Sequence, residues 1–252
     1  MINRQLFSGC KPCSSNCSYC FAKWAEYTPQ RKLDVWESRN LASVVYPCCD
    51  SEISKNNEVI EELWRMAKKT KNIYISIAVK GEIDSNVLDL YKKLNQYLKE
   101  KGKGFIKFSI SLTTKYRLSE IEPNTANYNE RQDIFSHLKC AGFYTSVILK
   151  PILPFISINE YKEIIDDFSE CNYFLLGDLY VNENTDFFKK YIKGKYQLEQ
   201  HAITWLEEHP VWQRISQRDR IKTIELYIHS MNRKAFQCDV DLIEYMSKCG
   251  GE

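Results

Sequence analysis

The sequence lacks any apolar stretch long enough to cross a bilayer. Its most hydrophobic run, residues 147–156, is interrupted by Lys150, Pro151 and Pro154, whereas a membrane helix needs about 20 apolar residues. The sequence also has little excess of either charge, because 35 basic and 33 acidic side chains leave a formal net charge of only +2. These absences exclude a membrane-spanning protein and a uniformly basic nucleic-acid coat. Any polyanionic partner would need a local patch.

Export signals and familiar catalytic patterns are missing too. Residues 1–7 contain neither a long apolar segment nor a small-residue cleavage site, so we expect a cytoplasmic protein with no membrane contact. No G-x-G-x-x-G loop and no Ser/His/Asp pattern is present, and the four histidines lack the spacing of metal ligands. The chemistry must therefore come from other residues.

The chain does contain alternating strand-like and helix-like segments. Its 252 residues, 44% of them hydrophobic, suffice for one large domain or two small ones. Short β-branched and aromatic runs predict strands at 5–8, 42–46, 73–79, 106–111, 145–149 and 173–179. Apolar residues at three- and four-residue spacing predict helices at 58–69, 86–100, 129–141 and 159–168. This alternation is typical of parallel α/β sheets.

Six βα units are two short of a full eight-stranded barrel. We therefore expect an α/β fold, a partial (β/α)6 TIM-like barrel over residues 1–190. Residues 191–252 are expected to form a helical C-terminal extension packed on the barrel, with helices at 197–207, 215–233 and 240–247 and no strand. No Gly/Ser linker or internal repeat marks a sharp boundary.

Cysteine is abundant in one place. Of ten cysteines, Cys13, Cys17 and Cys20 form a C-x3-C-x2-C triplet with Tyr19 directly before the last thiol. A chain without an export signal uses such clusters for metal or redox chemistry more often than for disulfides. Three thiolates on one short loop suit a [4Fe-4S] cluster, in which the fourth iron stays open to another ligand.

Two alternatives use Cys10 as a fourth ligand. A structural zinc site is chemically admissible, although such sites usually separate their two C-x2-C halves by a longer insertion than residues 14–16 provide. A closed four-cysteine cluster would leave no open iron and would make the chain an electron carrier. In the favoured reading Cys10 is not a ligand.

The triplet resembles the cluster loop of the radical S-adenosylmethionine (SAM) superfamily. Further matches follow in order up to residue 154 and resemble the spore photoproduct lyase-like branch. They are Phe108-Ser109-Ile110-Ser111, Glu122-Pro123-Asn124-Thr125, Arg131, Ala141-Gly142 and Pro151-Ile152-Leu153-Pro154.

The resemblance implies roles for individual residues. Cys13, Cys17 and Cys20 would ligate the [4Fe-4S] cluster, whose open iron binds SAM. Asp50 would hold the methionyl ammonium group of SAM, and Lys80 its carboxylate, through a charge-assisted contact. The other expected SAM contacts are Tyr19 and Ile152 at the adenine, Ser109 and Ser111 at the carboxylate or ribose, and Arg131. For Arg131 an alternative stays open, in which it pairs with Glu122 and fixes the loop over the barrel mouth.

The implied reaction is reductive cleavage of SAM to a 5′-deoxyadenosyl radical that takes a hydrogen atom from a substrate. An external electron donor of flavodoxin or ferredoxin type is implied as well. Cys48 and Cys49, beside Asp50, are the expected catalytic residues, because the lyases use a cysteine near the second strand as hydrogen donor. A nucleic-acid substrate and a paired partner protein are further expectations. The alternative of a different class is a non-catalytic iron-sulfur or zinc protein that transfers electrons or binds nucleic acid.

Overall fold

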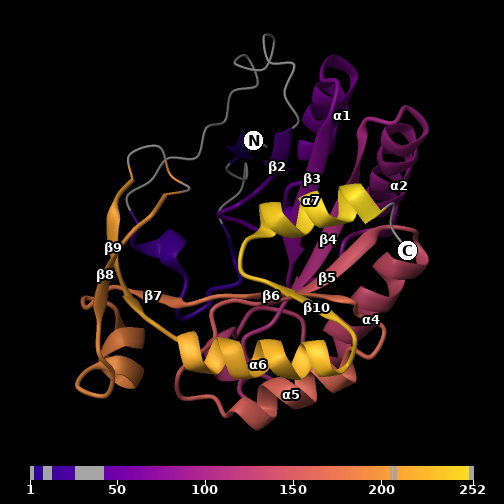
Figure 1. Cartoon of the computed structure of the whole chain (residues 1–252). Helices are drawn as coiled ribbons and strands as arrows, with labels where there is room; N and C mark the ends of the chain where they lie inside the picture. The colour runs from indigo at the N-terminus through magenta and orange to yellow at the C-terminus, as the bar shows by residue number, and fades with distance from the viewer. Residues whose placement is uncertain (1–2, 8–12, 26–42, 205, 207–208, 250–252) are drawn as a thin grey trace.

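A parallel sheet of seven strands organises the structure, a computed structural model that describes residues 3–7, 13–25, 43–204, 206 and 209–249 (Figure 1). The strands stand in the order β1-β2-β3-β4-β5-β6-β10, and every neighbouring pair is parallel. They are β1 (Asn3–Leu6), β2 (Ser43–Tyr46), β3 (Ile73–Val79), β4 (Gly104–Ser111), β5 (Tyr144–Leu149), β6 (Tyr173–Leu176) and β10 (Lys234–Phe236). Because β1 and β10 are the two edges in this order, the sheet is an open, incomplete barrel, as predicted.

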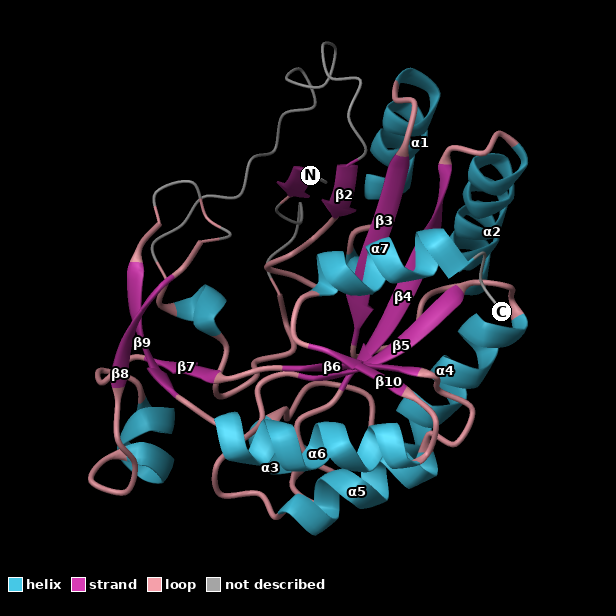
Figure 2. Ribbon diagram, viewed as in Figure 1, coloured by secondary structure: helices cyan, strands magenta, loops and turns pink. Residues whose placement is uncertain are grey.

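The connecting helices cover the outer face of this sheet (Figure 2). They are α1 (Val59–Lys69), α2 (Ser85–Glu100), α3 (Leu118–Ile121), α4 (Tyr128–Cys140), α5 (Ile158–Asp167) and α6 (Arg218–Ser230). Three of these helices begin with side-chain caps: the Asp84 side chain caps α2, Ser157 caps α5, and Asn127 forms a capping box with Glu130 at α4. Within the described part of the chain, no helix has the length and apolarity that a bilayer crossing requires.

The two faces of β4 show how the sheet is packed. Phe108 packs against Tyr91 of α2 and against Phe143, with ring centroids 5.7 and 4.8 Å away. Phe105 points to the other face, because side chains alternate along a strand, and packs there in the cluster that contains Ile243 of α7 (Asp239–Cys249). Helix α7 therefore lies across the inner face of the incomplete barrel (Figure 2).

A buried ion pair joins α7 to the inner face. Lys107 Nζ of β4 lies 2.8 Å from Asp239 Oδ1, with side chains 0% and 17% exposed. Burial alone would raise the pKa of Asp239, but the nearby Lys107 ammonium holds it below its usual value. Asp239 is the first residue of α7, where a carboxylate also faces the positive end of the helix dipole.

The prediction of a strand-free C-terminal extension was wrong. Helices α6 and α7 confirm two of the three predicted helices, but residues 197–207 contain β8 (Glu199–Ala202) instead of a helix. β8 pairs with β9 (Val211–Ile215), which pairs with β7 (Leu179–Val181) in a second, antiparallel sheet. β10 extends the main sheet at β6. The reason is tertiary: β9 lies between β7 and β8 and forms antiparallel ladders with both, with Trp212 and Ile215 buried and Val211 exposed. The division of the chain at residue 190 stays a prediction.

The end of the sixth predicted strand also differs. The strand was expected to run to Leu179, but β6 ends at Leu176 and the chain turns into the second sheet at β7. Gly177 stands at this break, where a Cβ atom would lie only 2.8 Å from Cε of Lys150. A side chain at this position would collide with Lys150.

Candidate functional site

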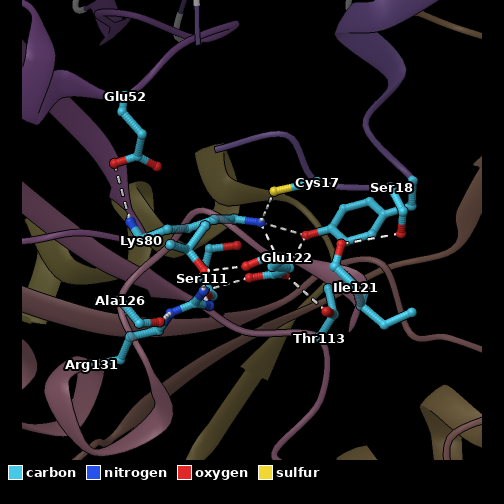
Figure 3. Close-up of polar contacts among 12 residues, drawn as sticks. Cys17, Ser18, Glu52, Lys80, Ser111, Thr113, Ile121, Glu122, Ala126 and Arg131 are labelled. Carbon is cyan, nitrogen blue, oxygen red and sulfur yellow. Dashed lines mark hydrogen bonds and ion pairs between the residues drawn. The ribbon is translucent and has the colours of Figure 1, made fainter. Parts of the chain in front are cut away.

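The polar site lies where the parallel strands end. Lys80 directly follows β3, Ser111 ends β4, and residues 13–20 belong to the loop after β1. Figure 3 shows side chains from these segments converging on Glu122, which follows α3. Ligand sites of parallel α/β folds form at this edge of the sheet.

Glu122 is the centre of the network. Its side chain is fully buried, with Oε1 3.0 Å from Lys80 Nζ and Oε2 2.6 Å from the Arg131 guanidinium. The hydroxyls of Tyr19 and Thr113 donate to Oε1 over 2.5 and 2.8 Å. Burial would raise the pKa of Glu122, but Lys80 and Arg131 outweigh it and lower the pKa to about 2. The carboxylate is therefore ionised at neutral pH.

Arg131 is held entirely by the fold. Its side chain is 0% exposed; Nε donates to the Ala126 carbonyl over 3.0 Å and Nη1 to the Ser111 carbonyl over 2.5 Å. Nη2 also donates to the Thr125 hydroxyl. The pairing with Glu122 that the sequence left open is thus present, and it ties α4 and the loop at residues 122–126 to the end of β4. Direct contact of Arg131 with a cofactor stays a prediction.

Lys80 connects this network to the cysteine loop. Its Nζ lies 3.3 Å from Cys17 Sγ, donates to the Tyr19 hydroxyl, and pairs with Glu122. Burial would lower the pKa of Lys80, but Glu122 and Cys17 raise it above its usual value. A protonated lysine next to a thiol stabilises the thiolate, which is the metal-binding form.

The loop at residues 13–20 is tied to the segment after α3. Ser18 donates to the Ile121 carbonyl from its backbone N–H over 2.9 Å and from its hydroxyl over 3.1 Å. The Asn124 amide donates to the Ser14 carbonyl over 3.1 Å. Asn16 supports a left-handed turn with φ of 50°, a conformation that asparagine tolerates. The loop therefore has defined anchors on both sides of Cys17.

The three thiols of this loop differ in exposure: Cys13 is exposed, Cys17 buried and Cys20 half-buried. Burial raises the pKa of Cys17 and of Cys20; Cys20 adds to the rise at Cys17, and Cys13 to that at Cys20. The thiols are thus close enough to repel as thiolates. In the described segments no three His, Cys, Asp or Glu side chains are arranged to hold a metal ion. Binding of a metal by the three thiols would therefore require the loop to rearrange. Cys10 lies outside the described residues.

Cys48, Cys49 and Asp50 form a turn directly after β2. Cys48 is buried with φ of 56°, and the Cys49 N–H donates to the Phe7 carbonyl over 2.9 Å. Cys49 and Asp50 are half-buried. The turn therefore stands at the same edge of the sheet as Lys80, while the catalytic roles of the two cysteines and the ammonium contact of Asp50 stay predictions.

Three other predicted SAM contacts lie in the fold's interior. Ser109 is fully buried and bonds to Ser146 over 2.8 Å and to Lys107 over 2.6 Å, in the ion-pair network below α7. Ser111 and Ile152 are also buried, at the ends of β4 and β5. The structure thus brings Tyr19, Lys80 and Arg131 together with Cys17, and it places Ser109 in another network.

Sequence reasoning missed Glu52 and Thr113. Glu52 follows β2 by six residues, is 9% exposed, and accepts the Lys80 N–H over 3.2 Å. Burial raises its pKa to about 7. The sequence signal that could have indicated Glu52 was its position in the loop after a predicted strand. Its burial depends on tertiary contacts and could not be predicted from the sequence.

Arginine and lysine side chains of the C-terminal region could contact phosphate groups only where their charges are not already paired within the fold. Arg214 pairs with Asp178 and Glu199, and Arg233 donates to the Ile165 carbonyl over 2.7 Å. Arg220 donates to the Ile156 carbonyl. These three guanidinium groups therefore support the fold.

Comparison with known proteins gives matches among solved structures alone, since neither a protein-family model nor a curated protein sequence matches the chain. A spore photoproduct lyase with a Cys→Ser substitution superimposes with a TM-score of 0.60 at 13% identity, over 91% of this chain and 72% of that one. The lyase complexed with dinucleoside spore photoproduct gives 0.59 at 12% identity, over 90% and 71%.

The radical S-adenosylmethionine methyltransferase TsrM from Kitasatospora setae, with cobalamin and a [4Fe-4S] cluster bound, gives 0.57 at 12% identity, over 91% of this chain and 51% of that one. All these identities are low, so what they establish is the architecture of the chain. The chain has the fold of spore photoproduct lyase and of a radical SAM methyltransferase, as the cysteine triplet and the motifs that follow it predicted.

Proposed function

We propose that the chain is a radical SAM enzyme that binds a [4Fe-4S] cluster through Cys13, Cys17 and Cys20. One observation carries the proposal: the cysteine loop lies at the ends of the parallel strands, with Cys17 Sγ 3.3 Å from the Lys80 ammonium. Solved structures of the same fold support it, since the lyase is known with bound AdoMet and TsrM with a [4Fe-4S] cluster.

The donor set fits such a cluster in kind and number. Three soft thiols on one loop are the ligands that iron-sulfur clusters use, and three of them leave one iron open. When bound, the cluster supplies the electron that splits SAM into methionine and a 5′-deoxyadenosyl radical, which takes hydrogen from the substrate. Lys80 lies beside the most buried of these thiols, where it offsets thiolate charge.

The chain's own residues would then bind and orient SAM. Lys80 is the proposed partner of the methionyl carboxylate and Asp50 that of the ammonium group, and both follow strand ends. Tyr19 and Ile152 are proposed to contact the adenine, with Ser111 near the ribose. Glu122 and Arg131 position Lys80 and Tyr19 from beneath, through the ion pairs and hydrogen bonds described above.

The substrate side of the proposal is broader. We propose a nucleic-acid-related substrate, supported by the lyase structure that holds a dinucleoside, with Cys48 or Cys49 as hydrogen donor. We propose that a flavodoxin- or ferredoxin-type protein supplies the electron. We also propose that the chain acts together with a paired partner protein. Because Arg214, Arg220 and Arg233 are engaged inside the fold, substrate contacts would come from other residues.

Substitution of Lys80 or Asp50 tests the SAM site. Lys80→Ala and Asp50→Ala should each weaken SAM binding by roughly 10- to 150-fold, because each removes one charge-assisted bond. Calorimetric titration of the reconstituted proteins measures this, with iron content showing whether the cluster is intact. The exposed Lys92→Ala variant, which loses only a surface pair with Asp89, is the matched control. Unchanged SAM affinity in both site variants would contradict the proposed site.

A further inference from the structure

A basic surface lies beside the cysteine loop. Its cations are Arg117, at the start of α3, and four lysines in and after the short helix η4 (Phe188–Ile192), namely Lys189, Lys190, Lys193 and Lys195. The four lysines are exposed, and the Arg117 side chain is 35% exposed. η4 is a π-helix, a rare form that is often found at functional sites.

Two contacts join this basic surface to the cysteine loop. The Phe187 ring, directly before η4, lies 6.3 Å from the ring of Tyr19 in the loop. Glu120 of α3 accepts from Lys190 over 2.9 Å, and the carbonyl of the next residue accepts both hydrogen bonds of Ser18 (Figure 3). The basic surface is therefore part of the immediate surroundings of the loop that carries the proposed cluster ligands.

Glu120 holds the base of the surface in one arrangement. It also accepts from Arg117 Nε over 2.8 Å and from the Tyr191 hydroxyl. Its hydrogen-bond donors lower its pKa to about 2, so it is ionised at neutral pH. The Arg117 guanidinium lies over the rings of Phe155 and Tyr191, 5.1 and 5.4 Å from their centroids. The segment that carries the lysines is thus anchored to α3 by charge and by ring contacts.

Most of the positive charge on this surface is not neutralised. In the described ion pairs the five cations have two carboxylate partners, Glu120 and the fully exposed Asp186, which lies 3.8 Å from Lys189. Lys193 and Lys195 make no ion pair in the part of the chain that the structure describes. Because the whole chain has a net charge of only +2, this local concentration of cations creates a positive potential that attracts an acidic partner.

The side chains of the surface favour an acidic protein over a nucleic acid. Proteins that bind single-stranded nucleic acids present aromatic rings on which bases stack. The rings beneath these lysines are buried instead, since Phe187 is 5% exposed and Tyr191 9%. Lysines are flexible point charges, which suit the weak, electrostatically steered contacts of electron-transfer complexes.

We propose that this basic surface docks an acidic electron-carrier protein of flavodoxin type. The inference rests on the proposed function, because the carrier donates one electron to the cluster held by the adjacent cysteine loop. The flavin of the carrier is oxidised by one electron, the cluster is reduced by one, and no atom is transferred. Electron transfer requires the two redox centres to come close together, and the contact of Phe187 with Tyr19 places the docking surface next to the loop.

The rate of 5′-deoxyadenosine formation from SAM tests the docking. Lys189→Glu/Lys193→Glu reverses two exposed charges and should slow the reaction driven by reduced flavodoxin by roughly fivefold or more. With dithionite, a small reductant that needs no docking surface, the rate should stay unchanged. The matched control is Lys93→Glu/Lys101→Glu, which makes the same change of net charge at exposed positions of α2 and its C-terminal end and should keep the wild-type rates.

Binding is measured separately, by fluorescence anisotropy of labelled flavodoxin titrated with the reconstituted protein. The wild type should bind at about 20 mM salt and lose most of its affinity at about 200 mM, because salt screens exposed charges. Lys189→Glu/Lys193→Glu should bind roughly fivefold or more weakly at low salt. If the wild type forms no 5′-deoxyadenosine even with dithionite, the proposed function fails, and this titration still decides whether the surface docks the carrier.

Four results would overturn the docking proposal. They are an unchanged affinity and rate with flavodoxin in the folded variant, an equal loss in the control variant, an equal loss with dithionite, and displacement of flavodoxin by a single-stranded oligonucleotide that the variant also binds more weakly. The last result would assign the surface to a nucleic acid. If Lys189→Glu/Lys193→Glu does not fold, Lys193→Gln/Lys195→Gln replaces it, because both residues follow η4; its expected loss of affinity is roughly threefold, and an unchanged affinity would contradict the docking.

Discussion

Alanine at Cys13, Cys17 or Cys20 is expected to abolish the iron-sulfur cluster, whereas Cys10→Ala should retain it. The wild-type protein, purified without oxygen and reconstituted, should hold about four irons and four sulfides and absorb broadly near about 400 nm. Each triplet cysteine supplies one of only three thiolates, so removal of any one leaves a second iron without a protein ligand. Cys17 should be the most sensitive position, because it is buried and contacts Lys80.

Iron and sulfide analysis of the four variants checks this expectation, with Cys140→Ala as the matched control. Cys140 is an exposed, free thiol at the end of α4, far along the chain from the loop. Loss of the cluster in Cys10→Ala would favour the closed four-cysteine site. Stoichiometric zinc without sulfide in the wild type would favour a structural zinc protein.

Glu122→Gln is expected to destabilise the fold by about 3–5 kcal/mol at neutral pH, because it leaves buried cations without their counter-ion. Arg131 and Glu122 are both fully buried, and Lys80 is nearly so. Urea unfolding followed by tryptophan fluorescence measures the change. The matched control is Glu170→Gln, whose side chain is 68% exposed and pairs with Lys139 at the surface; such a pair contributes about 0–1 kcal/mol.

The difference in unfolding free energy between the wild type and Glu122→Gln should depend on pH with a definite sign. The pKa of Glu122 falls from 4.5 to about 2 in the folded chain. The ionised carboxylate therefore stabilises the fold above the unfolded pKa, and this contribution, about 3 kcal/mol, is lost as pH falls toward 2. The stability gap between wild type and Glu122→Gln should accordingly shrink between about pH 5 and pH 2. A gap of less than about 1 kcal/mol at pH 7 would show that the ion pairs do not support the site.

Most strands of the barrel were predictable because the local sequence pattern of each one indicates a strand. Most of the six predicted strands are near-continuous apolar runs, as strands buried on both faces must be, and the helices between them have a clear apolar period. β8 and β9 were not predictable in this way, because Glu199 to Ala202 is mostly polar, has no buried residue, and becomes a strand only by pairing with β9. The same holds for β10, a three-residue strand specified by β6.

The site was predictable where a residue type stood at a strand end and not where burial made the residue important. Lys80 directly follows β3, and the cysteine triplet lies in the loop after β1, so their convergence could be anticipated. The internal roles of Glu52 and Lys107 could not, because glutamate and lysine are usually exposed. Ser109 stays a predicted SAM contact, and in the structure its hydroxyl bonds to Lys107 and Ser146, a pairing that only the β4 and β5 register reveals.

The most direct test of the proposed function is product analysis of SAM. The anaerobically reconstituted protein, incubated with SAM and a strong reductant, should release 5′-deoxyadenosine and methionine slowly even without substrate. Cys48→Ala and Cys49→Ala should leave this reaction intact, since a hydrogen donor acts after substrate attack, and Cys17→Ala should abolish it. A wild-type protein that carries the cluster but neither binds SAM nor forms 5′-deoxyadenosine would contradict a radical SAM enzyme and indicate an electron carrier or a binding protein.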